Sequence, residues 1–406
     1  MSKIAFVSSC YESVAYSNFD LYIQKLIEQL IISGINVEVL TTCSKTEMKE
    51  WGFNYYKKSQ DAVKGVLVRR FKIKKRSKYL NEIIDYKISN KIPITEKEEN
   101  EYMHDRLYSQ DLLDYITLNS TTYNLFVFID YSCGLTYWGS KICPEKSVLI
   151  PFLNDNGIAY LDSIRDMFSD FSGVIFNSLT EEILAKKLYD FKATATKVLC
   201  FGITPCIDID VNVNMNKYKF SNPFIIFNGT DESNTNIKRI IASFLLFKER
   251  NPKSNLLLVW FGIDDNYKIP EVCNDFVHNL GVLSEAEQHK VCMAADILWY
   301  SSKNPYRIPF LLKGWALEKP VIMYDNCIEL RNIAIKNNCA LYYSNYIEFE
   351  KAVLFLQDNK ELALKIGQLG KKYIVENHSL ENKIEEYIRF FNVCVGGSVE
   401  SETNED

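Results

Sequence analysis

Short apolar runs alternate along the chain with longer segments in which apolar residues recur at helical spacing. Residues 3–7 form an apolar run that predicts a buried strand, and the apolar residues of 19–30 recur every three or four positions, which predicts a helix. Gly34 predicts the end of that helix, and 37–42 is the next predicted strand. Together these elements form one strand–helix–strand unit of the kind that builds parallel sheets.

The same alternation recurs on both sides of a polar segment. Further strands are predicted for the apolar runs 125–130, 147–153, 173–178, 223–230, 256–262, 294–302 and 320–325. Between the two series, residues 201–222 are polar, rich in asparagine and without helical period. The predicted fold class is therefore α/β, with two Rossmann-like parallel-sheet domains that face each other across a cleft.

The length of the chain agrees with two domains. Its 406 residues exceed what one ordinary core needs and suit two domains of about 150 to 200 residues each. We expect an N-terminal domain over 1–200, a linker over 201–222 and a C-terminal domain over 223–385. Residues 386–406 are predicted to form the end of a C-terminal helix and a disordered tail.

Composition narrows the class of protein. Hydrophobic residues make up 47% of the chain and charged residues 24%, as in folded soluble proteins, and the net charge of −5 argues against nucleic acid as a partner. The 11 cysteines show no CxxC pair, so we expect reduced thiols in a cytoplasmic protein and no zinc site. The chain begins directly with a predicted strand, and no apolar stretch reaches the ~18 residues of a membrane span. We therefore expect neither a signal peptide nor a transmembrane helix.

Basic residues concentrate between Lys64 and Lys78, where some alternate with apolar residues at strand spacing. One interpretation is a solvated strand edge that is protected by charge. The other is a patch, Arg69–Arg76, that docks on anionic lipid headgroups at the inner face of the membrane or on an anionic acceptor. The sequence leaves both interpretations open.

Several stretches, in order, resemble bacterial glycosyltransferase family 4 over nearly the whole chain. They are 25–44 with 65–71, 106–116 with 123–132 and 147–168, 173–189, and 278–325. The resemblance implies the GT-B fold and the transfer of a hexose-type sugar, with retention, from a nucleotide sugar to a surface polysaccharide or glycoconjugate. It implies no metal and no cofactor besides the nucleotide-sugar substrate.

The donor side of the resemblance departs from the family pattern. The family places an Arg and a Lys against the donor diphosphate, where this sequence has Thr230 and Thr235. Hydroxyl groups carry no charge, and charge-assisted hydrogen bonds are roughly twice as strong as neutral ones. The diphosphate would be held weakly unless Lys238 or Arg239 substitutes, and we expect both of these on the outer face of their helix.

Two family glutamates that contact the donor sugar and ribose are also replaced, here by Pro305 and Lys313. A proline cannot accept a hydrogen bond from a sugar hydroxyl, and an ammonium reverses the sense of the ribose contact. The residues that remain as donor-binding candidates are Gly229, Thr230, Thr235, Gly262, Val282, Tyr306, Arg307 and Lys313.

The acceptor side departs from the family in a similar way. Ser17 and Asn18 stand in the loop where the family has glycines, and Asn154 and Asp155 stand where it has His and Asp. Asn154 and Asp155 are the candidate catalytic pair, although a neutral Asn can orient a hydroxyl but cannot relay a proton.

Two functions therefore remain open. The first is a glycosyltransferase with a nucleotide-sugar donor and a glycan or glycolipid acceptor. The second is an inactive pseudo-glycosyltransferase that binds or stabilises an active partner glycosyltransferase, since the loss of several donor contacts together is what relaxed selection on catalysis would leave.

Overall fold

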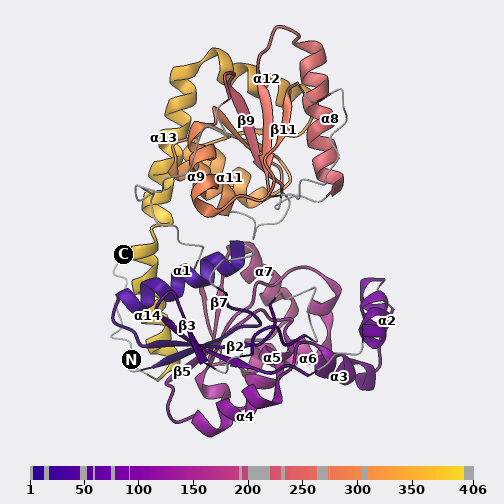
Figure 1. Cartoon of the computed structure of the whole chain (residues 1–406), viewed down its shortest axis with the longest axis vertical. Coiled ribbons are helices and arrows are strands. Elements are labelled where there is room, and N and C mark those ends of the chain that lie inside the picture. Colours follow the sequence, from indigo (N-terminus) through magenta and orange to yellow (C-terminus); the bar gives the residue numbers. More distant parts are fainter. Residues whose placement is uncertain are drawn as a thin grey trace. The chain divides into compact units, whose positions relative to one another are not determined.

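The computed structural model of the chain contains two compact units, shown in Figure 1. The first consists of Met1–Phe201 with Leu380–Asp406, and the second of Gly202–Ser379. The structure describes residues 3–12, 18–45, 53–57, 60–74, 78–90, 92–191, 194–199, 220–229, 234–262, 273, 275–302 and 309–396. Most of the predicted linker, 201–219, lies outside these ranges.

The described part of the first unit contains an eight-stranded sheet in the order β3-β4-β2-β1-β5-β6-β7-β8. The pairs are parallel except for the β3–β4 hairpin. The strands are β1 (Ile4–Val7), β2 (Val37–Thr42), β3 (Gln60–Val63), β4 (Val66–Phe71), β5 (Leu125–Ile129), β6 (Ser147–Ile150), β7 (Gly173–Phe176) and β8 (Ala195–Val198). The chain runs outward from β1 in one direction and then from β5 in the other, so the carboxyl ends of β1 and β5 mark a topological switch point.

Burial explains why apolar runs predicted the central strands. Every residue of β1, β2, β5, β6 and β7 is buried, because helices cover both faces of the sheet. The edge strand β4 instead alternates between buried and partly buried positions. The helices of this unit are α1 (Asn18–Ile32), α2 (Lys78–Ser89), α3 (Glu96–Asp105), α4 (Gln110–Asn119), α5 (Gly134–Gly139), α6 (Asp162–Asp170), α7 (Leu179–Leu188) and α14 (Leu380–Cys394).

The described part of the second unit contains a six-stranded, wholly parallel sheet in the order β11-β10-β9-β12-β13-β14. Its switch point lies between β9 and β12. The strands are β9 (Phe224–Asn228), β10 (Leu257–Phe261), β11 (Val277–Asn279), β12 (Ile297–Tyr300), β13 (Val321–Tyr324) and β14 (Leu341–Tyr343). The helices are α8 (Asn234–Arg250), α9 (Glu285–Ala294), α10 (Pro309–Ala316), α11 (Ile328–Asn337), α12 (Tyr346–Asp358) and α13 (Lys360–Asn377). The prediction of two Rossmann-like parallel-sheet domains is confirmed.

Helix α13 packs closely on the second unit through two glycines. A Cβ atom on Gly367 would lie 1.9 Å from the carbonyl oxygen of Glu318, and one on Gly370 would lie 2.4 Å from a ring carbon of Trp315. The absence of side chains at these positions lets the helix backbone approach α10 and the turn that follows it.

Helix α14 belongs to the first unit, where Figure 1 shows it in yellow beside α1. The hydroxyls of Tyr22 and Tyr387 are hydrogen-bonded, and a Cβ atom on Gly173 would lie 2.4 Å from the Sγ of Cys394. The sequence-based boundaries, which carried the C-terminal domain to 385, differ from this division. An amphipathic pattern shows which face of a helix is apolar but not which sheet it covers.

Candidate functional site

Polar side chains gather at the carboxyl end of the second sheet, around its switch point. Asn236, on the first turn of α8, donates from Nδ2 to the carbonyl oxygen and to the Oγ of Ser301, both at 3.2 Å. Asn326, which follows β13, donates to the same carbonyl at 2.9 Å. Ser301 follows β12 and is fully buried. These contacts join the ends of β12 and β13 to the start of α8.

Arg239 adds a positive charge to this cluster. Its guanidinium carbon lies 4.1 Å from the ring centroid of Tyr324, the last residue of β13. Within the described residues, the Nη2 of Arg239 and the Oδ1 of Asn326 are buried without a hydrogen-bond partner. The guanidinium of Arg239 can stabilise an anion, because it is planar, always charged and rich in hydrogen-bond donors.

The position of Arg239 corrects one expectation from the sequence. We expected both Lys238 and Arg239 on the outer face of the helix, but only Lys238 is exposed. Arg239 follows Asn236 by three positions, so the two side chains lie on the same face of α8. That spacing was a signal in the sequence that could have placed Arg239 beside the sheet.

Three predicted donor-binding residues lie after the ends of neighbouring strands. Gly262 follows β10 and donates its N–H to the carbonyl oxygen of Gly281 at 2.7 Å. Both glycines have positive φ, at 91° and 69°, which favours glycine there. Val282 comes next and is 78% exposed. Gly229 directly follows β9 in the same sheet.

Lys313 is linked to the loop that carries Val282 through the side chain of Gln288. Its Nζ lies 3.5 Å from the Oε1 of Gln288 on α9, and the Nε2 of Gln288 donates to the carbonyl oxygen of Leu283 at 3.0 Å. The structure thus brings Lys313 near the loop that carries Val282. Other predicted residues lie outside the described residues, namely Ser17, Thr230, Pro305, Tyr306 and Arg307. Asn18 and Thr235 belong to the first turns of α1 and α8, and their side chains are not described.

The candidate catalytic pair lies in the loop after β6, in the first unit. Asn154 donates from Nδ2 to the carbonyl oxygen of Phe152 at 3.2 Å, and Asp155 is exposed and accepts a hydrogen bond from the Tyr160 hydroxyl at 2.7 Å. The two side chains therefore make separate contacts. The backbone of Phe152 has a φ of 54°, which is uncommon for a residue with a side chain.

A buried carboxyl group that sequence reasoning missed anchors this loop. Glu181 is fully buried and accepts hydrogen bonds from the N–H of Leu153 at 2.6 Å and from the N–H of Asn177 at 2.5 Å. Burial raises the pKa of Glu181 to about 8, although these bonds favour the charged form. The sequence shows a Ser178-x-x-Glu181 pattern at the start of α7, and a capping box is its usual interpretation. The Glu181 side chain reaches further, and ties the loop after β6 to the end of β7.

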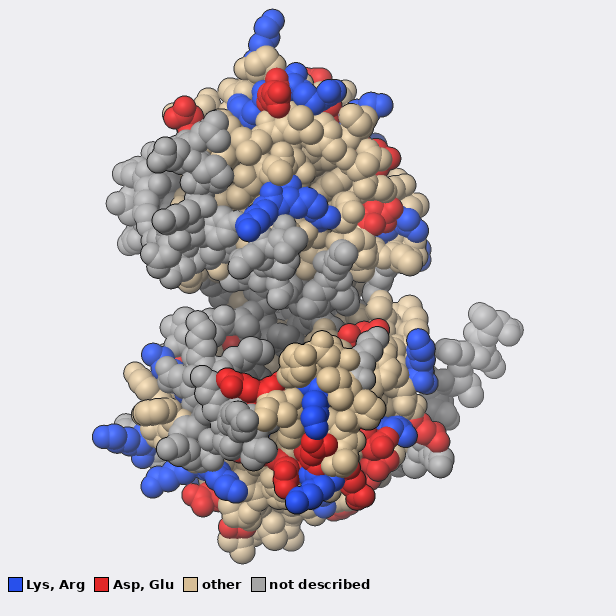
Figure 2. Space-filling model, turned by 90° about the vertical axis from the view of Figure 1, so that its right-hand side faces the viewer, with Lys and Arg blue, Asp and Glu red and all other residues tan. Residues whose placement is uncertain are grey.

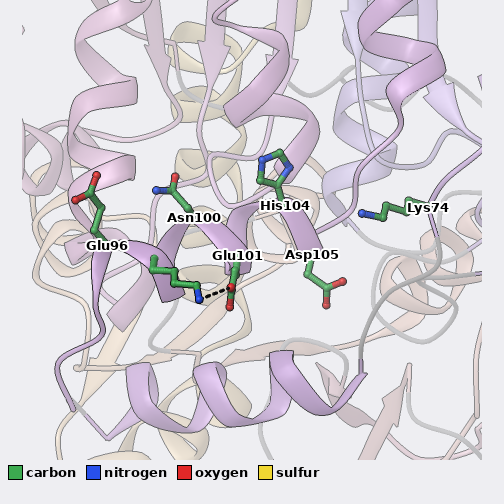
Figure 3. A pocket seen from close by; sticks show the side chains of 7 residues that line it. Lys74, Glu96, Asn100, Glu101, His104 and Asp105 are labelled. Atoms are coloured by element: carbon green, nitrogen blue, oxygen red, sulfur yellow. Dashed lines mark ion pairs between the residues drawn. The ribbon is translucent and has the colours of Figure 1, made fainter.

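A pocket of about 660 Å³ opens on the first unit beside α3 (Figure 3). Its lining carries both signs of charge, and Lys97 and Glu101 form an ion pair at 3.8 Å. His104 lines it and stacks on Trp138 with ring centroids 4.1 Å apart; burial and the charge of Lys74 lower the pKa of His104. Apart from Lys74, none of the sequence-predicted residues lines this pocket.

Of the basic segment Arg69–Arg76, the structure describes residues 69–74, and only some of these are available to a surface partner. Arg69 pairs with the buried carboxylate of Glu38, and Arg70 is 4% exposed. Lys72 and Lys74 are exposed. Figure 2 shows that, on the face it draws, Lys and Arg are interspersed with Asp and Glu over the described residues.

The described ranges contain neither a metal-binding cluster nor a membrane-spanning helix. No three His, Cys, Asp or Glu side chains there gather as they would around a metal ion. Nor does any helix in those ranges combine the length and the apolar character that crossing a bilayer requires.

Comparison with known structures identifies the fold. No family model and no curated protein matches the sequence. Among solved structures, a sucrose-phosphate synthase from Thermosynechococcus elongatus aligns with a TM-score of 0.69 and 13% identity over 98% of this chain and 100% of that chain. The chain has the GT-B fold.

Two further GT-B structures resemble the chain over nearly their full length. The trehalose-6-phosphate synthase OtsA aligns with a TM-score of 0.71 and 10% identity over 96% of this chain and 99% of that chain. Anabaena HepE in complex with UDP and glucose aligns with a TM-score of 0.66 and 11% identity over 97% and 100%. At such low identity, the likeness establishes the GT-B fold alone.

Proposed function

We propose that the chain is a glycosyltransferase that transfers a hexose-type sugar from a nucleotide-sugar donor to a polysaccharide or other glycoconjugate. The observation that carries the proposal is Arg239, a partly buried guanidinium at the switch point of a GT-B second sheet. Membership of family 4 and retention of the anomeric configuration belong to the same proposal, and rest on the sequence resemblance.

The chemistry of the donor explains the need for this cation. As the glycosidic bond breaks, negative charge develops on the leaving diphosphate, and a preorganised positive group lowers the energy of that transition state. We assign this role to Arg239, because Thr230 and Thr235 offer no charge. Ligands of doubly wound sheets bind at the carboxyl ends of the strands near a switch point, where Arg239 and Asn326 lie.

The remaining donor contacts are proposed around the ends of β10 and β11. Gly229 and Gly262 leave room for close backbone approach, and Val282 offers an exposed apolar contact for the base. Lys313 would meet the ribose or an adjacent phosphate. Because HepE is described in complex with UDP, we propose a uridine diphosphate sugar as the first donor to test. On the acceptor side, Asn154 would orient the attacking hydroxyl, and Asp155 would lie beside it. No metal or cofactor is assigned a role.

Calorimetric titration with UDP, UDP-glucose and GDP-mannose tests the proposal. Arg239→Gln is expected to weaken UDP binding by about tenfold or more, because a charge-assisted contact is replaced by a neutral one. Lys238→Gln is the matched control, since Lys238 is its exposed neighbour on the same helix. Absence of binding at millimolar nucleotide, or equal losses in the two variants, would refute the assignment.

The inactive alternative draws support from Lys313, an ammonium where the family has a carboxylate. If the chain is a pseudo-glycosyltransferase, it would bind and stabilise an active glycosyltransferase without turning over a donor. The two functions are separated by measuring UDP release from UDP-sugars alongside co-purification of a partner enzyme. Release by the isolated chain excludes the inactive alternative.

We also propose that the protein works in the cytoplasm and contacts the inner face of the membrane through segment 69–76. Within that segment, the exposed Lys72 and Lys74 would supply the attraction to anionic lipid. Co-sedimentation with phosphatidylserine vesicles tests this membrane contact. It is compared between the wild type and a Lys72→Gln/Lys74→Gln variant. Equal sedimentation of both proteins would argue against this contact.

A further inference from the structure

A second guanidinium, on the first unit, is more deeply buried than that of Arg239. Arg70 lies near the end of β4 and is 4% exposed, because β4 alternates and Val66, Val68 and Arg70 share its buried positions. The Nη2 of Arg70 donates to the carbonyl oxygen of Tyr11 at 2.6 Å. Within the described residues, its Nε and Nη1 are buried and have no hydrogen-bond partner.

The surroundings of Arg70 come from three adjoining strands. Tyr11 follows β1, Cys43 follows β2, and the N–H of Cys43 donates to the carbonyl oxygen of Phe71 at 2.8 Å. The carbonyl oxygen of Cys43 in turn accepts the N–H of Tyr56 at 2.9 Å. This bond holds the Tyr56 ring against Arg70, whose guanidinium carbon lies 4.0 Å from the ring centroid.

Charge makes this arrangement unusual. Buried charges in proteins are generally paired with an opposite charge or fully hydrogen-bonded. Arg69, the preceding residue on the same strand, follows that rule because it pairs with Glu38. No acidic side chain in the described structure forms an ion pair with Arg70. A carbonyl and an aromatic face offset only part of the lost hydration of a guanidinium.

We infer that Arg70 forms an oxyanion-binding site at the carboxyl end of the first sheet, which takes a phosphate or carboxylate group. The Nε and Nη1 of Arg70 keep N–H donors without a partner, and each can donate to an oxygen of such a group. The Tyr11 carbonyl oxygen and the Tyr56 ring contact this guanidinium, at the edge of the sheet where ligands of this fold class bind. Assigning the oxyanion to the acceptor, as a phosphorylated or acidic sugar, rests on the proposed function; the site itself does not.

Titration with inorganic phosphate and with acetate, at constant ionic strength adjusted with sodium chloride, tests the site. Phosphate is expected to raise the melting temperature of the wild type, and Arg70→Met is expected to lose that rise. Arg70→Lys should retain it with about tenfold weaker binding, because a compact ammonium replaces the planar set of N–H donors. A larger response to phosphate than to acetate identifies a phosphate site, and the reverse identifies a carboxylate site.

Arg69→Met is the matched control on the same strand. It leaves the buried Glu38 with fewer partners and should lower the melting temperature, while the response to the anion is retained. Arg70→Met without anion should be at least as stable as the wild type, because it removes an unpaired buried charge. A purely structural Arg70 would give the opposite pattern: a destabilised Arg70→Met and no response to either anion in the wild type.

Nucleotide titration of Arg70→Met separates this site from the proposed function. Unchanged UDP affinity together with lost phosphate binding supports both the oxyanion site and the donor assignment, because Arg239 lies on the second unit. Phosphate binding without any nucleotide binding would refute the donor assignment alone. An equal rise in melting temperature in the wild type and in Arg70→Met would overturn the oxyanion site.

Discussion

Replacing Glu181 by Gln tests how the loop that carries the candidate catalytic pair is held. The carboxyl group accepts three hydrogen bonds: from the N–H of Leu153, from the N–H of Asn177 and from the Nδ2 of Asn177 at 3.1 Å. A Gln side chain keeps one accepting oxygen and turns an NH₂ group toward the remaining donors. The less costly orientation keeps both Asn177 bonds and leaves the Leu153 N–H unpaired.

The magnitude follows from that single lost bond. A buried donor without a partner costs about 1 to 3 kcal/mol, so Glu181→Gln should lower the free energy of unfolding by that amount. Phe152, directly before Leu153, has a left-handed backbone at φ 54° that the lost bond helps to maintain. Loop 152–156 should therefore open more often than the rest of the unit.

Hydrogen exchange followed by mass spectrometry measures the local effect, and urea unfolding measures the global one. A loss of one to two kcal/mol corresponds to about 5- to 30-fold faster exchange of the Leu153 amide. Glu182→Gln is the control, because Glu182 pairs with the exposed Lys186 and should change stability by less than about 1 kcal/mol. Unchanged protection of Leu153 in Glu181→Gln would refute the anchoring role.

The pH dependence of the same variant has a definite sign. Burial raises the pKa of Glu181 from 4.5 to about 8 in the folded state, so between these values the folded protein holds a proton that the unfolded chain releases. The contribution of Glu181 to stability is therefore full below pH 4.5 and falls as the pH rises toward 8. The stability difference between wild type and Glu181→Gln should shrink over this window, and a difference that grows would contradict the assignment.

Three further predictions concern the fold. Burial alone would raise the pKa of Glu38, but hydrogen bonds from Lys3, Tyr123 and Arg69 lower it overall. The contribution of Glu38 to stability is therefore present above pH 4.5 and is lost as the pH falls through the lowered pKa. The urea midpoints of wild type and Glu38→Gln should converge in acid. Gly367→Ala should destabilise by about 1 to 3 kcal/mol despite its better helix propensity, measured by thermal unfolding, because its Cβ would meet the Glu318 carbonyl. Tyr387→Phe should lower stability by about 1 kcal/mol through the lost bond to Tyr22, and a variant as stable as the wild type would show that α14 is held by apolar packing alone.

Sequence patterns predicted the fold better than the site, for a physical reason. Strands buried on both faces must be apolar, so runs such as 125–130 were unambiguous. The role of a single polar residue depends instead on where its side chain turns. Arg70 was assigned to a basic segment that could be either a solvated strand edge or an anion-docking patch, although its two-residue spacing from Val66 and Val68 already placed it on the buried face. Glu181 was hidden by a pattern that also describes an ordinary helix cap.

The geometry of α8 explains how the proposed donor site would carry a charge although the residues at the family's cationic positions are neutral here. Thr235, which replaces a family cation, and Arg239 are four residues apart and therefore lie one above the other on the same helical face. Helical side chains lean toward the N-terminus of their helix, which directs the long Arg239 side chain toward the preceding turn. Its contact with Tyr324 at the carboxyl end of β13 agrees with that direction. A cation lost at the start of the helix can thus be supplied from the next turn, which is why the proposed donor assignment depends on Arg239.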